Sequence, residues 1–450
     1  MAIATLLVAN RGEIAVRIIR AARELGIRTV QVHSQPDAES LAVRLADRAI
    51  EIGPAQAARS YLNIEAILDA ARQTGADAVH PGYGFLAENA SFAEACADAG
   101  IQFIGPPPAA IQAMGDKAAA RALMQKHKIP VIPGTEGAVR TEQQALRAAS
   151  KVGFPLMVKA AAGGGGRGMR IVHAENDLPH AVSVAQTEAA AAFGSPDVYL
   201  EKFLEEPRHV EFQILADQEG RVIHLGEREC SIQTERHQKM IEEGPCIALT
   251  SKQRAAMGKV AVRAARAAGY QNAGTVEFLL DRDGRFYFIE MNTRIQVEHP
   301  VTEWLTGVDL IKAQIRIAAG EPLHLRQEDI QPRGHCLEAR VTAEDPARGF
   351  RPSAGQITRL ELPGGFGVRV DTHLFPSYTV PSYYDSLLCK ITAWGADREA
   401  AIRRLDRCLA ELRIEGIATN TEYLRRILAN GWFRKGELST NFLRRRMNGR

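Results

Sequence analysis

Two glutamates flank a predicted β-hairpin, and their spacing could bind a divalent cation. Asp283-Gly284 is typical of a two-residue turn between strands, and a turn centred there places Glu277 opposite Glu290. Opposed Cβ atoms lie about 5 Å apart, so these like charges need a shared proton or a bridging cation. Asn292 follows on the same face and adds an oxygen. Oxygen ligands favour magnesium or manganese, as found with nucleotide phosphates; the alternative is two solvated glutamates on an open face.

Polar side chains alternate directly after this hairpin and could bind a small acid. If residues 293–300 are extended, Arg294, Gln296 and Glu298 share one side. A guanidinium binds a small oxyanion, an amide orients it, and a carboxylate can take its proton. The alternative is a surface ion-pair strip. The preceding polar segment 230–239, by itself, is typical of a solvated loop.

A glycine-rich run, residues 163–168, predicts a phosphate-binding loop. It follows the apolar strand-like run 156–158 and Lys159, and it contains Arg167. Glycines let the backbone approach a polyphosphate, and a lysine on a strand adds a positive charge. No Gly-Lys-Ser/Thr follows, so the run is not a Walker A loop. The alternative is a flexible linker.

The elements that must position these side chains begin with a predicted parallel sheet flanked by helices. Strand-like runs alternate with helical spacing in the first part of the chain, at residues 6–9, 29–32, 78–80 and 102–104. The first turn lacks G-x-G-x-x-G, so a dinucleotide site is not supported there. Prolines 106–108 end this region, because consecutive prolines continue neither a strand nor a helix.

The 450 residues predict about three domains of α/β type. We expect a Rossmann-like parallel-sheet domain over residues 1–114, a second domain over 115–330 that holds the glycine-rich run and the carboxylate hairpin, and an α+β domain over 331–450. The closing helix of the third domain has an apolar face predicted from the spacing of Ile402, Leu405, Leu409 and Leu412.

The composition excludes several classes of protein. Lys and Arg number 56 against 53 Asp and Glu, a net charge of +3 that is too balanced for a nucleic-acid or anionic-membrane surface. The 6 cysteines are scattered without a C-x-x-C pair, which indicates neither a zinc site nor a disulfide framework. The N-terminal apolar run is too short for a signal peptide, and no apolar run reaches the about 18 residues of a membrane span. We therefore expect a cytoplasmic protein that binds neither nucleic acid nor membrane.

Together these motifs resemble biotin carboxylase, the ATP-grasp subunit of biotin-dependent carboxylases such as acetyl-CoA carboxylase. The resemblance covers nearly the whole chain, and its most specific part is the string from Glu290 to Glu303. The other matching segments are residues 9–15, 80–86, the glycine-rich run, 334–335, 338–346 and 384–387. The resemblance implies that residues 115–330 form the ATP-grasp domain, with a mobile lid at about 131–203.

The resemblance also implies roles for individual residues. Metal ligands would be Glu277, Glu290 and Asn292, as the hairpin suggests independently. The ATP-binding residues would be Lys117, Lys159, Gly163, Gly164, Gly165, Gly166, Gly168, Glu201, Lys202, Phe203, Leu204, His209, Gln233, His237, Glu277 and Glu290. The bicarbonate pocket would comprise Lys239, Arg294, Gln296 and the backbone of Val297. Glu298 would be the general base, Arg340 would steady the enolate of biotin, and Lys239 and Arg294 would complete the catalytic set.

The implied reaction is phosphoryl transfer followed by carboxylation. Glu298 deprotonates bicarbonate, which attacks the γ-phosphate of ATP while magnesium or manganese and lysines neutralise the phosphate oxygens. The resulting carboxyphosphate breaks down to CO2 and phosphate in a closed site, and phosphate takes the ureido proton of biotin. Arg340 then stabilises the enolate that attacks CO2. This would be the first half-reaction of acetyl-CoA carboxylase, in malonyl-CoA and fatty acid synthesis, or of a related acyl-CoA carboxylase.

One segment departs from the family pattern. The family reads Gln-Arg-Arg-His-Gln-Lys, whereas the segment from Gln233 to Lys239 is one residue longer and lacks the first arginine. Either the loop bulges, or Gln233 and His237 do not both hold their usual places. Lys239 stays in register, because the pair Glu242-Glu243 follows as expected.

Partners follow from the resemblance as well. The sequence contains no Met-Lys-Met biotinyl-lysine motif, so biotin would arrive on a separate biotin carboxyl carrier protein, with carboxyltransferase subunits completing the complex. Arg20, Phe366 and Arg369 match residues near the family's two-fold axis and imply a homodimer. The final carboxyl acceptor stays open between acetyl-CoA, another acyl-CoA, pyruvate and urea.

Two other functions share part of this pattern. A different ATP-grasp ligase, joining a carboxylate to an amine, would not need Arg294, Gln296, Glu298 and Arg340 together. A non-catalytic ATP-binding subunit would bind nucleotide without bicarbonate-dependent hydrolysis. Substrate trials with free biotin as the control separate these alternatives.

Overall fold

A computed structural model describes residues 3–135, 137–160, 169–193, 196–236 and 238–447. The chain divides into two compact units, and each is described by itself. The first unit comprises Met1–Ile129, Arg208–Phe278 and Glu290–Arg450, and the second comprises Pro130–Pro207 and Leu279–Ile289. The segment 131–203, expected to form a lid, falls within the second unit.

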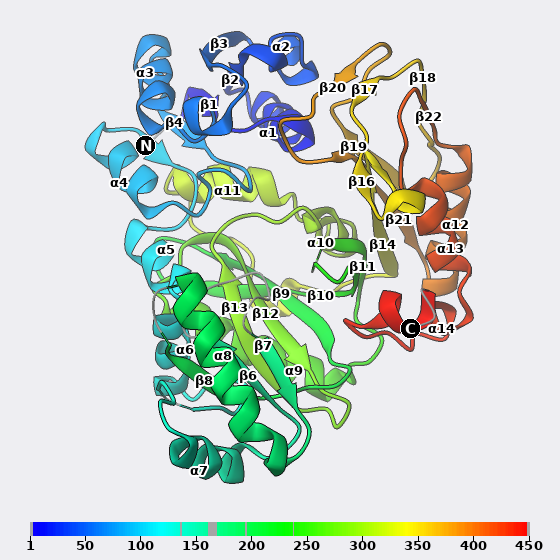
Figure 1. The fold of residues 1–450 in the computed structure, drawn as a ribbon. Helices are drawn as coiled ribbons and strands as arrows, with labels where there is room; N and C mark the ends of the chain where they lie inside the picture. The colour runs from blue at the N-terminus through cyan, green and yellow to red at the C-terminus, as the bar shows by residue number, and fades with distance from the viewer. Residues whose placement is uncertain (1–2, 136, 161–168, 194–195, 237, 448–450) are drawn as a thin grey trace. The chain divides into compact units, whose positions relative to one another are not determined.

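The first unit begins with a parallel sheet in the order β3-β2-β1-β4-β5. Its strands are β1 (Thr5–Val8), β2 (Arg28–Ser34), β3 (Arg48–Gly53), β4 (Ala78–His80) and β5 (Gln102–Phe103), and the helices between them are α1 (Gly12–Glu24), α2 (Leu41–Leu45), α3 (Ile64–Thr74) and α4 (Ala90–Asp98) (Figure 1). The predicted parallel sheet is confirmed. Strand β3 was not predicted, because the charged residues Arg48 and Glu51 leave this edge strand largely exposed and interrupt its apolar pattern.

Side chains contact one another at the carboxyl end of β1. Arg11 follows that strand, and its Nε and Nη2 lie 2.7 and 2.8 Å from the two carboxylate oxygens of Asp37. Tyr61 donates its hydroxyl to the same carboxylate at 2.7 Å, and the Tyr384 ring centroid lies 4.2 Å from the Arg11 guanidinium. Ligands of parallel α/β sheets bind at this end of the strands. The arrangement therefore agrees with the absence of a dinucleotide-binding motif.

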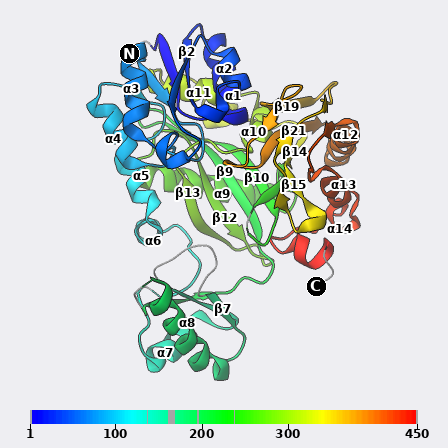
Figure 2. The ribbon, with the colours of Figure 1, turned by 45° about the horizontal axis from the view of Figure 1, so that its top comes forward.

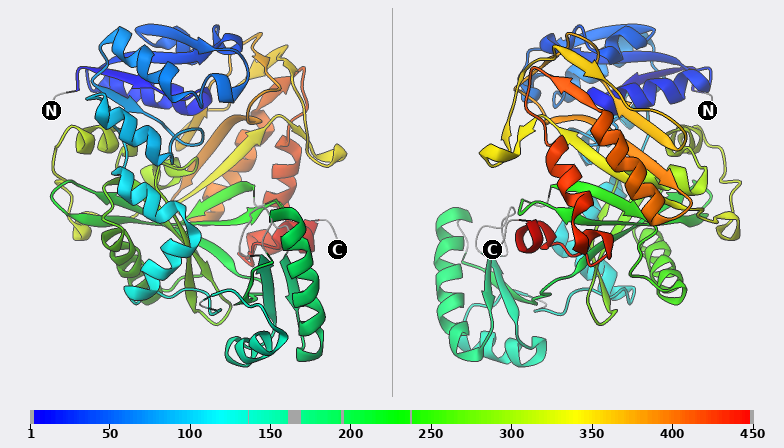
Figure 3. Two further views of the ribbon diagram at one scale, coloured as in Figure 1. Left: turned by 60° about the vertical axis from the view of Figure 1, so that its left-hand side comes forward. Right: turned by 90° about the vertical axis from the view of Figure 1, so that its right-hand side faces the viewer.

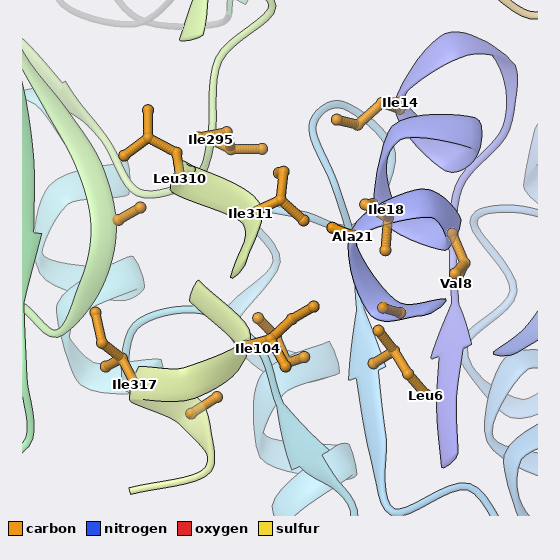
Figure 4. Close-up of a cluster of buried hydrophobic side chains, with 14 of the residues drawn as sticks. Leu6, Val8, Ile14, Ile18, Ala21, Ile104, Ile295, Leu310, Ile311 and Ile317 are labelled. Atoms are coloured by element: carbon orange, nitrogen blue, oxygen red, sulfur yellow. The ribbon is translucent and has the colours of Figure 1, made fainter. Parts of the chain in front are cut away.

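A buried apolar cluster joins this sheet to helix α11 (Leu310–Ala318) (Figure 4). Leu6 from β1, Ile18 from α1 and Ile311 from α11 belong to it, and α1 and α11 lie near one another in Figure 2. Full burial of such a side chain stabilises the fold by about 1.5–3 kcal/mol. Ile295 belongs to the same cluster, so the core also anchors the segment that leads to Glu298.

A second, larger sheet in the order β13-β12-β9-β10-β11-β14-β21-β19 forms the rest of the framework. Its strands are β9 (Arg208–Ala216), β10 (Val222–Gln233), β11 (Lys239–Gly244), β12 (Asn272–Leu280), β13 (Phe286–Asn292), β14 (His335–Thr342), β19 (Val368–Thr372) and β21 (Leu387–Gly395). The pairs β9–β10, β10–β11, β11–β14, β14–β21 and β19–β21 are antiparallel. Successive side chains of a strand therefore alternate between the two faces of this sheet.

One face of β14 and β21 is apolar and packs against helices. Leu337, Ala339 and Ile391 lie in a buried cluster with Leu405 and Leu424, which come from α12 (Arg398–Glu411) and α13 (Thr421–Ala429). Figure 3 (right) shows these helices, in orange and red, lying side by side along the strands. The predicted apolar helix face is confirmed, although α12 ends at Glu411 and Leu412 is its C-cap. The intervening side chains of β14 and β21 point to the other face, which carries the site.

The second unit is a small sheet covered by helices. Its antiparallel sheet has the order β7-β6-β8, with β6 (Leu156–Ala160), β7 (Met169–Val172) and β8 (Val198–Lys202). Helices α7 (Glu142–Val152) and α8 (Leu178–Phe193) pack on it around a core that includes Leu156, Val158 and Leu200. This arrangement positions Lys159 and Glu201 on neighbouring strands.

The remaining elements complete the two units. The other helices are α5 (Pro108–Gly115), α6 (Lys117–Lys126), α9 (Ser251–Ala267), α10 (His299–Thr306) and α14 (Gly431–Arg434). The short strands are β15 (Glu344–Asp345), β16 (Arg351–Pro352), β17 (Gly355–Gln356), β18 (Arg359–Glu361), β20 (Thr379–Val380) and β22 (Arg413–Glu415). Within the described residues, no helix combines the length and the apolar character needed to cross a bilayer.

The turn between β12 and β13 is longer than predicted. The backbone N–H of Asp281 donates to the carbonyl of Arg285 at 2.7 Å, and Gly284 donates to the carbonyl of Asp281 at 3.0 Å. Gly284 has φ +83°, which identifies a type I turn followed by a left-handed glycine. The predicted two-residue turn is therefore wrong: Asp281 and Arg285 close the turn, so the loop has the three residues 282–284, and Asp283 forms a side-chain ion pair with Arg285 at 2.5 Å.

Candidate active site

Lys239, the first residue of β11, lies among three carboxylates. Its Nζ is 2.6 Å from Oε1 of Glu298, 2.7 Å from Oε2 of Glu211 and 3.3 Å from Oε1 of Glu277. Burial alone lowers the pKa of a lysine, but Cys230 and these carboxylates outweigh it and hold the pKa of Lys239 well above its ordinary value. The cluster therefore contains an ammonium that stays charged across the physiological range.

Glu298 bridges two cations at the start of helix α10. Its Oε1 lies beside Lys239, and its Oε2 lies 2.8 Å from Nη2 of Arg340, which comes from β14. Burial alone raises the pKa of Glu298, but Lys239, Arg340 and Arg228 outweigh it and hold the pKa well below that of an ordinary carboxyl group. Glu298 is thus an ionised carboxylate in a buried position.

Arg228 is a buried cation that contacts several side chains of this cluster. It is fully buried on β10, and its Nε lies 2.7 Å from Oε1 of Glu211. Its Nη2 donates to Oε1 of Gln296 at 2.6 Å, and Nη1 donates to the hydroxyl of Thr302 at 2.8 Å. Since Arg228 takes the amide oxygen of Gln296, the amide nitrogen faces Glu277, to which it donates at 2.8 Å.

The segment after the hairpin is bent where an extended strand was expected. Bends at Thr293 and Arg294 and a turn at Val297-Glu298 interrupt it, so the segment is not a continuous strand. Gln296 and Glu298 still meet the Lys239 cluster. Arg294 lies at the edge of the cluster: its Nε lies 2.9 Å from Glu88, and its Nη2 donates at 3.1 Å to Oδ1 of Asn292, which in turn donates to Glu277.

Glu277 is the most heavily hydrogen-bonded of the predicted metal ligands. Its Oε2 lies 2.8 Å from Nε2 of His209, and Asn292 donates Nδ2 to its Oε1 at 2.8 Å. Burial alone raises its pKa, but Lys239 and His209 outweigh it and hold the pKa well below the ordinary value. Glu290 is more exposed, and its Oε2 lies 3.2 Å from Nζ of Lys117. The direct opposition of Glu277 and Glu290 stays a prediction.

The backbone of Val297 is also held in place. Its carbonyl accepts a hydrogen bond from Nζ of the fully buried Lys390 at 2.5 Å, and the same ammonium lies 3.1 Å from Glu13. Tyr83 donates its hydroxyl to Glu13. The residue predicted for the bicarbonate pocket is therefore fixed by a charged pair that links β21 to α1.

The longer segment before Lys239 forms a bulge. Gln233 pairs with Lys239 across β10 and β11, and the register shifts between Ile232 and Gln233. Thr234 donates its backbone N–H to the carbonyl of Gln238 at 2.9 Å, which closes the loop. Of the two alternatives, the register shift favours a bulge, and Gln233 is buried; whether Gln233 and His237 both hold the places usual in the family stays a prediction. His237 lies outside the described residues.

The second unit holds the other predicted nucleotide residues. Lys159 on β6 and Glu201 on β8 form an ion pair, and Nζ of Lys202 donates to the carbonyl of Phe154 at 2.7 Å. Phe203 donates its backbone N–H to the carbonyl of Pro155 at 3.1 Å, and Leu204 is buried. Residues 163–168, predicted to bind phosphate, lie outside the described residues.

Several residues of this cluster were missed by the sequence analysis. Glu211 could have been found, because His209, Glu211 and Gln213 alternate with apolar residues and so share one face of β9. Arg228 lies between two glutamates and resembles a solvated charge run, so its burial has no clear signal in the sequence. Glu88 comes from a loop of the N-terminal sheet, far from Arg294 in the sequence.

Comparison with known proteins places this constellation in a family. Protein-family models match residues 2–111 (biotin carboxylase, N-terminal domain), 116–326 (carbamoyl-phosphate synthase L chain, ATP binding domain) and 338–445 (biotin carboxylase C-terminal domain). A biotin carboxylase from Nostoc sp. is 56% identical over 97% of this chain and 98% of its own. The chain belongs to the biotin carboxylase family.

Further relatives of this biotin carboxylase family member include solved structures. A biotin carboxylase of Bacillus subtilis is 51% identical over 97% of this chain and 97% of its own. A crystal structure of the Campylobacter jejuni biotin carboxylase has a TM-score of 0.91 at 47% identity, covering 99% of each chain. The biotin carboxylase domain of a thermophilic 2-oxoglutarate carboxylase, bound to bicarbonate, has a TM-score of 0.95 at 46% identity, covering 99% of this chain and 98% of that one. The predicted family and α/β fold class are confirmed.

The chemistry of the predicted metal ligands fits a hard divalent cation. Glu277 and Glu290 offer carboxylate oxygens, and the depressed pKa of Glu277 keeps that group deprotonated. Asn292 offers an amide oxygen, which accepts from Arg294 in this structure. The donor set contains no sulfur, which agrees with the magnesium or manganese expected of a biotin carboxylase.

Proposed function

We propose that this protein carboxylates biotin, using ATP to activate bicarbonate. The observation that carries the proposal is the position of Glu298, whose two carboxylate oxygens lie 2.6 Å from Lys239 and 2.8 Å from Arg340. An ionised carboxylate beside two cations suits a base that serves a small anion, since the cations bind the anion while the carboxylate takes its proton. The identity to biotin carboxylases over nearly the whole chain supports the same reaction.

The strength of Glu298 as a base depends on what Lys239 and Arg340 contact. In the arrangement described, both cations neutralise Glu298 and lower its pKa, which makes it a weak base. When a bicarbonate oxygen takes part of these contacts, the lowering is smaller and the pKa of Glu298 rises. The carboxylate therefore becomes a better base when its substrate is bound.

The neighbouring residues orient the anion. Gln296 is fixed by Arg228 at its oxygen, so its amide N–H groups are the ones directed toward the cluster. The guanidinium of Arg294 contacts Glu88 in this structure, and it binds the anion after that contact is broken. We assign Lys239, Arg294, Gln296 and the Val297 backbone to the bicarbonate pocket.

The nucleotide residues are assigned from the resemblance to biotin carboxylases, separately for each unit. In the first unit we assign Lys117, His209, Gln233, His237, Glu277 and Glu290 to ATP, and in the second we assign Lys159, Glu201 to Leu204 and residues 163–168. Glu277, Glu290 and Asn292 would hold magnesium or manganese, which offsets the negative charge of the phosphates. Lys117 and Lys159 orient and neutralise the phosphates with positive charge of their own.

The proposed reaction has two steps, the formation of carboxyphosphate and the carboxylation of biotin. A bicarbonate oxygen, deprotonated by Glu298, bonds to the γ-phosphorus as the bond to ADP breaks. The carboxyphosphate formed separates into CO2 and phosphate; phosphate accepts the ureido proton of biotin, and the ureido nitrogen bonds to CO2. Arg340 donates to the enolate oxygen during this second step, so biotin leaves carboxylated.

We propose partners of two kinds. Biotin arrives on a biotin carboxyl carrier protein, and carboxyltransferase subunits use the product. The chain also forms a homodimer through the surface that includes Arg20, Phe366 and Arg369; Phe366 is 81% exposed, which is unusual for such a large apolar side chain. The related domain of Hydrogenobacter thermophilus 2-oxoglutarate carboxylase crystallised as a dimer with MgADP and bicarbonate, which supports this assignment.

The test of the proposed function measures ATP hydrolysis with and without bicarbonate and free biotin. We expect hydrolysis that requires bicarbonate, rises with biotin and is matched by formation of carboxybiotin. Hydrolysis that requires an amine and another carboxylate, and ignores biotin, would instead indicate an ATP-grasp carboxylate–amine ligase. Nucleotide binding without hydrolysis would indicate a non-catalytic subunit.

A further inference from the structure

Titratable side chains form a row on the face of the sheet opposite helices α12 and α13. Glu242 of β11 pairs with Glu338 of β14, and Arg340 of β14 pairs with Lys390 of β21. Because residues two apart share a face, these four side chains lie on the same side. Glu242, Glu338 and Lys390 are fully buried, so the row is enclosed.

Arg340 is held from two sides within this row. Its Nε lies 2.5 Å from Oε1 of Glu242, and its Nη2 lies 2.8 Å from Oε2 of Glu298. Two ion pairs at different nitrogens of one planar guanidinium fix both its position and the orientation of its plane. Nη1 is the remaining terminal nitrogen through which Arg340 can reach a substrate oxygen.

Glu338 has no comparable contact. Among the described residues, neither of its oxygens has a hydrogen-bond partner, and the same is true of Oε2 of Glu242. Burial, with Glu242 as an added negative charge, holds the pKa of Glu338 well above its ordinary value. Burial also raises the pKa of Glu242, to about 7, although Arg340 opposes the shift. Two opposed buried glutamates repel each other when both are charged, and the contact with Arg340 favours the charge on Glu242.

Other charged or titratable groups lie around Glu242 and Glu338. They are Lys239 on the same strand as Glu242, Cys230 on β10, Glu298 before α10, Lys390 on β21, and Glu13 on α1, which pairs with Lys390. None of the hydrogen bonds of Arg340 described above involves Glu338. The contact with Glu242 is thus the feature that distinguishes the two glutamates.

We propose that Glu242 is a positioning residue for the biotin step, which orients the guanidinium of Arg340 through Nε, while the opposed Glu338 makes no such contact. The inference rests on the proposed function, since it takes Arg340 as the group that meets the biotin enolate. A rotated Arg340 would still leave Lys239 beside Glu298, so the bicarbonate step depends less on Glu242 than the biotin step does.

The primary test compares Glu242→Gln with Glu338→Gln. Both substitutions place the same neutral amide at opposed, buried positions of the same strand pair. We expect Glu242→Gln to raise the KM for free biotin, or lower the biotin-stimulated rate, by about tenfold, the loss of one oriented charged contact. Bicarbonate-dependent ATP hydrolysis without biotin should change by less than about threefold. Glu338→Gln should behave as the unmodified protein in both assays.

A double substitution tests whether Glu242 acts through Arg340. In an Arg340→Gln background, adding Glu242→Gln should leave the residual biotin-dependent rate unchanged within about twofold, since the two effects are not independent. A full further loss in that background would overturn the inference. Circular dichroism and nucleotide affinity establish that each variant is folded, and Glu242→Asp, which retains the charge, replaces Glu242→Gln if the latter is unfolded and should retain part of the biotin response.

The pH dependence supplies a readout that a purely structural role would not move. Protonated Glu242 resembles glutamine, so the difference in biotin KM between the unmodified protein and Glu242→Gln should shrink from about pH 8 to about pH 6. A constant difference, or an equal effect of both single variants, would contradict the inference. If the unmodified protein shows no biotin-dependent turnover, the proposed function fails instead.

Discussion

Nζ of Lys239 lies 2.6 Å from Oε1 of Glu298, closer than to either of the other carboxylates that contact it. The ammonium and the proposed base thus neutralise each other before substrate binds. A bicarbonate ion that enters must exchange part of this ion pair for its own contacts. Substrate binding and activation of the base are therefore linked through one pair of atoms.

Replacing the proposed base should stop the first chemical step. Glu298→Gln keeps the size of the side chain but removes the group that accepts the bicarbonate proton, and we expect bicarbonate-dependent ATP hydrolysis to fall by about 10²–10⁴-fold. We expect the variant to stay folded, because the amide oxygen can accept from one of the two cations and Lys239 and Arg340 keep Glu211 and Glu242 as partners. Ordinary turnover by this variant would exclude Glu298 as the base.

Reversing the charge at a proposed metal ligand should weaken nucleotide binding. Glu290→Lys replaces a carboxylate that lies 3.2 Å from Lys117 with a second ammonium, so the site loses affinity for a divalent cation. We expect the magnesium-dependent part of ATP binding, measured by calorimetry with and without the metal, to disappear while the protein stays soluble. Unchanged affinity in both conditions would contradict the metal assignment.

Glu88 should affect bicarbonate rather than biotin. It pairs with Arg294 at 2.9 Å and also accepts from the backbone N–H of Thr293 at 3.0 Å. Glu88→Gln removes the charge that competes with bicarbonate for Arg294. We therefore expect the KM for bicarbonate to fall by about threefold or more while the KM for biotin stays constant. Initial rates with each substrate varied in turn measure both constants. A change confined to biotin would place Arg294 outside the bicarbonate pocket.

An exposed aromatic residue should support the homodimer. Phe366→Glu introduces a charge on the proposed contact surface, and sedimentation should show a shift from dimer to monomer. Tyr383, which is 62% exposed and lies outside the assigned surface, provides the control. Tyr383→Glu should leave the oligomeric state unchanged. A dimer that survives Phe366→Glu would require another interface.

A buried carboxylate outside the cluster should make stability depend on pH. Glu243 lies 2.7 Å from His335 and 2.6 Å from Arg398. Burial alone raises its pKa, but these partners outweigh it and lower the pKa from 4.5 to about 2. The folded-state pKa is depressed, so the stabilisation is fully present above about pH 4.5 and is lost as the pH falls toward 2.

The size of that effect can be measured directly. A pKa shift of this size contributes on the order of 3 kcal/mol to the free energy of unfolding at neutral pH. We expect Glu243→Gln to unfold at lower denaturant concentration than the unmodified protein at pH 7, and the difference to shrink in acid. A difference that does not change with pH would mean that Glu243 titrates alike in the folded and unfolded states.

The fold was predictable where each local pattern agreed with its surroundings. The apolar run from Leu6 to Ala9 and the helical spacing after it are both retained in the parallel sheet. The hairpin turn was not, because Asp283-Gly284 fits both a two-residue turn and the last positions of a longer one with Gly284 at positive φ. Local sequence alone does not distinguish these, and the ion pair of Asp283 with Arg285 depends on the actual geometry.

The site was predictable for residues in specific motifs and not for those that support them. Glu298 and Gln296 belong to a string whose resemblance is strong, and both lie in the Lys239 cluster. Arg228 and Glu242 are charged residues on strands, where a sequence gives their alternation but not which neighbouring strand faces them. Their importance comes from pairings between β10, β11 and β14, which are set by the folded sheet.

The two faces of β14 make assembly of the reaction centre inseparable from correct strand alignment. Leu337 and Ala339 face the helices, while Glu338 and Arg340 alternate with them toward the opposite side. A slip by one position would place the guanidinium of Arg340 in the apolar layer under α12 and leave Ala339 or Val341 beside Glu298. The strand register that buries the apolar face of β14 is therefore also the register that places Arg340 beside Glu298.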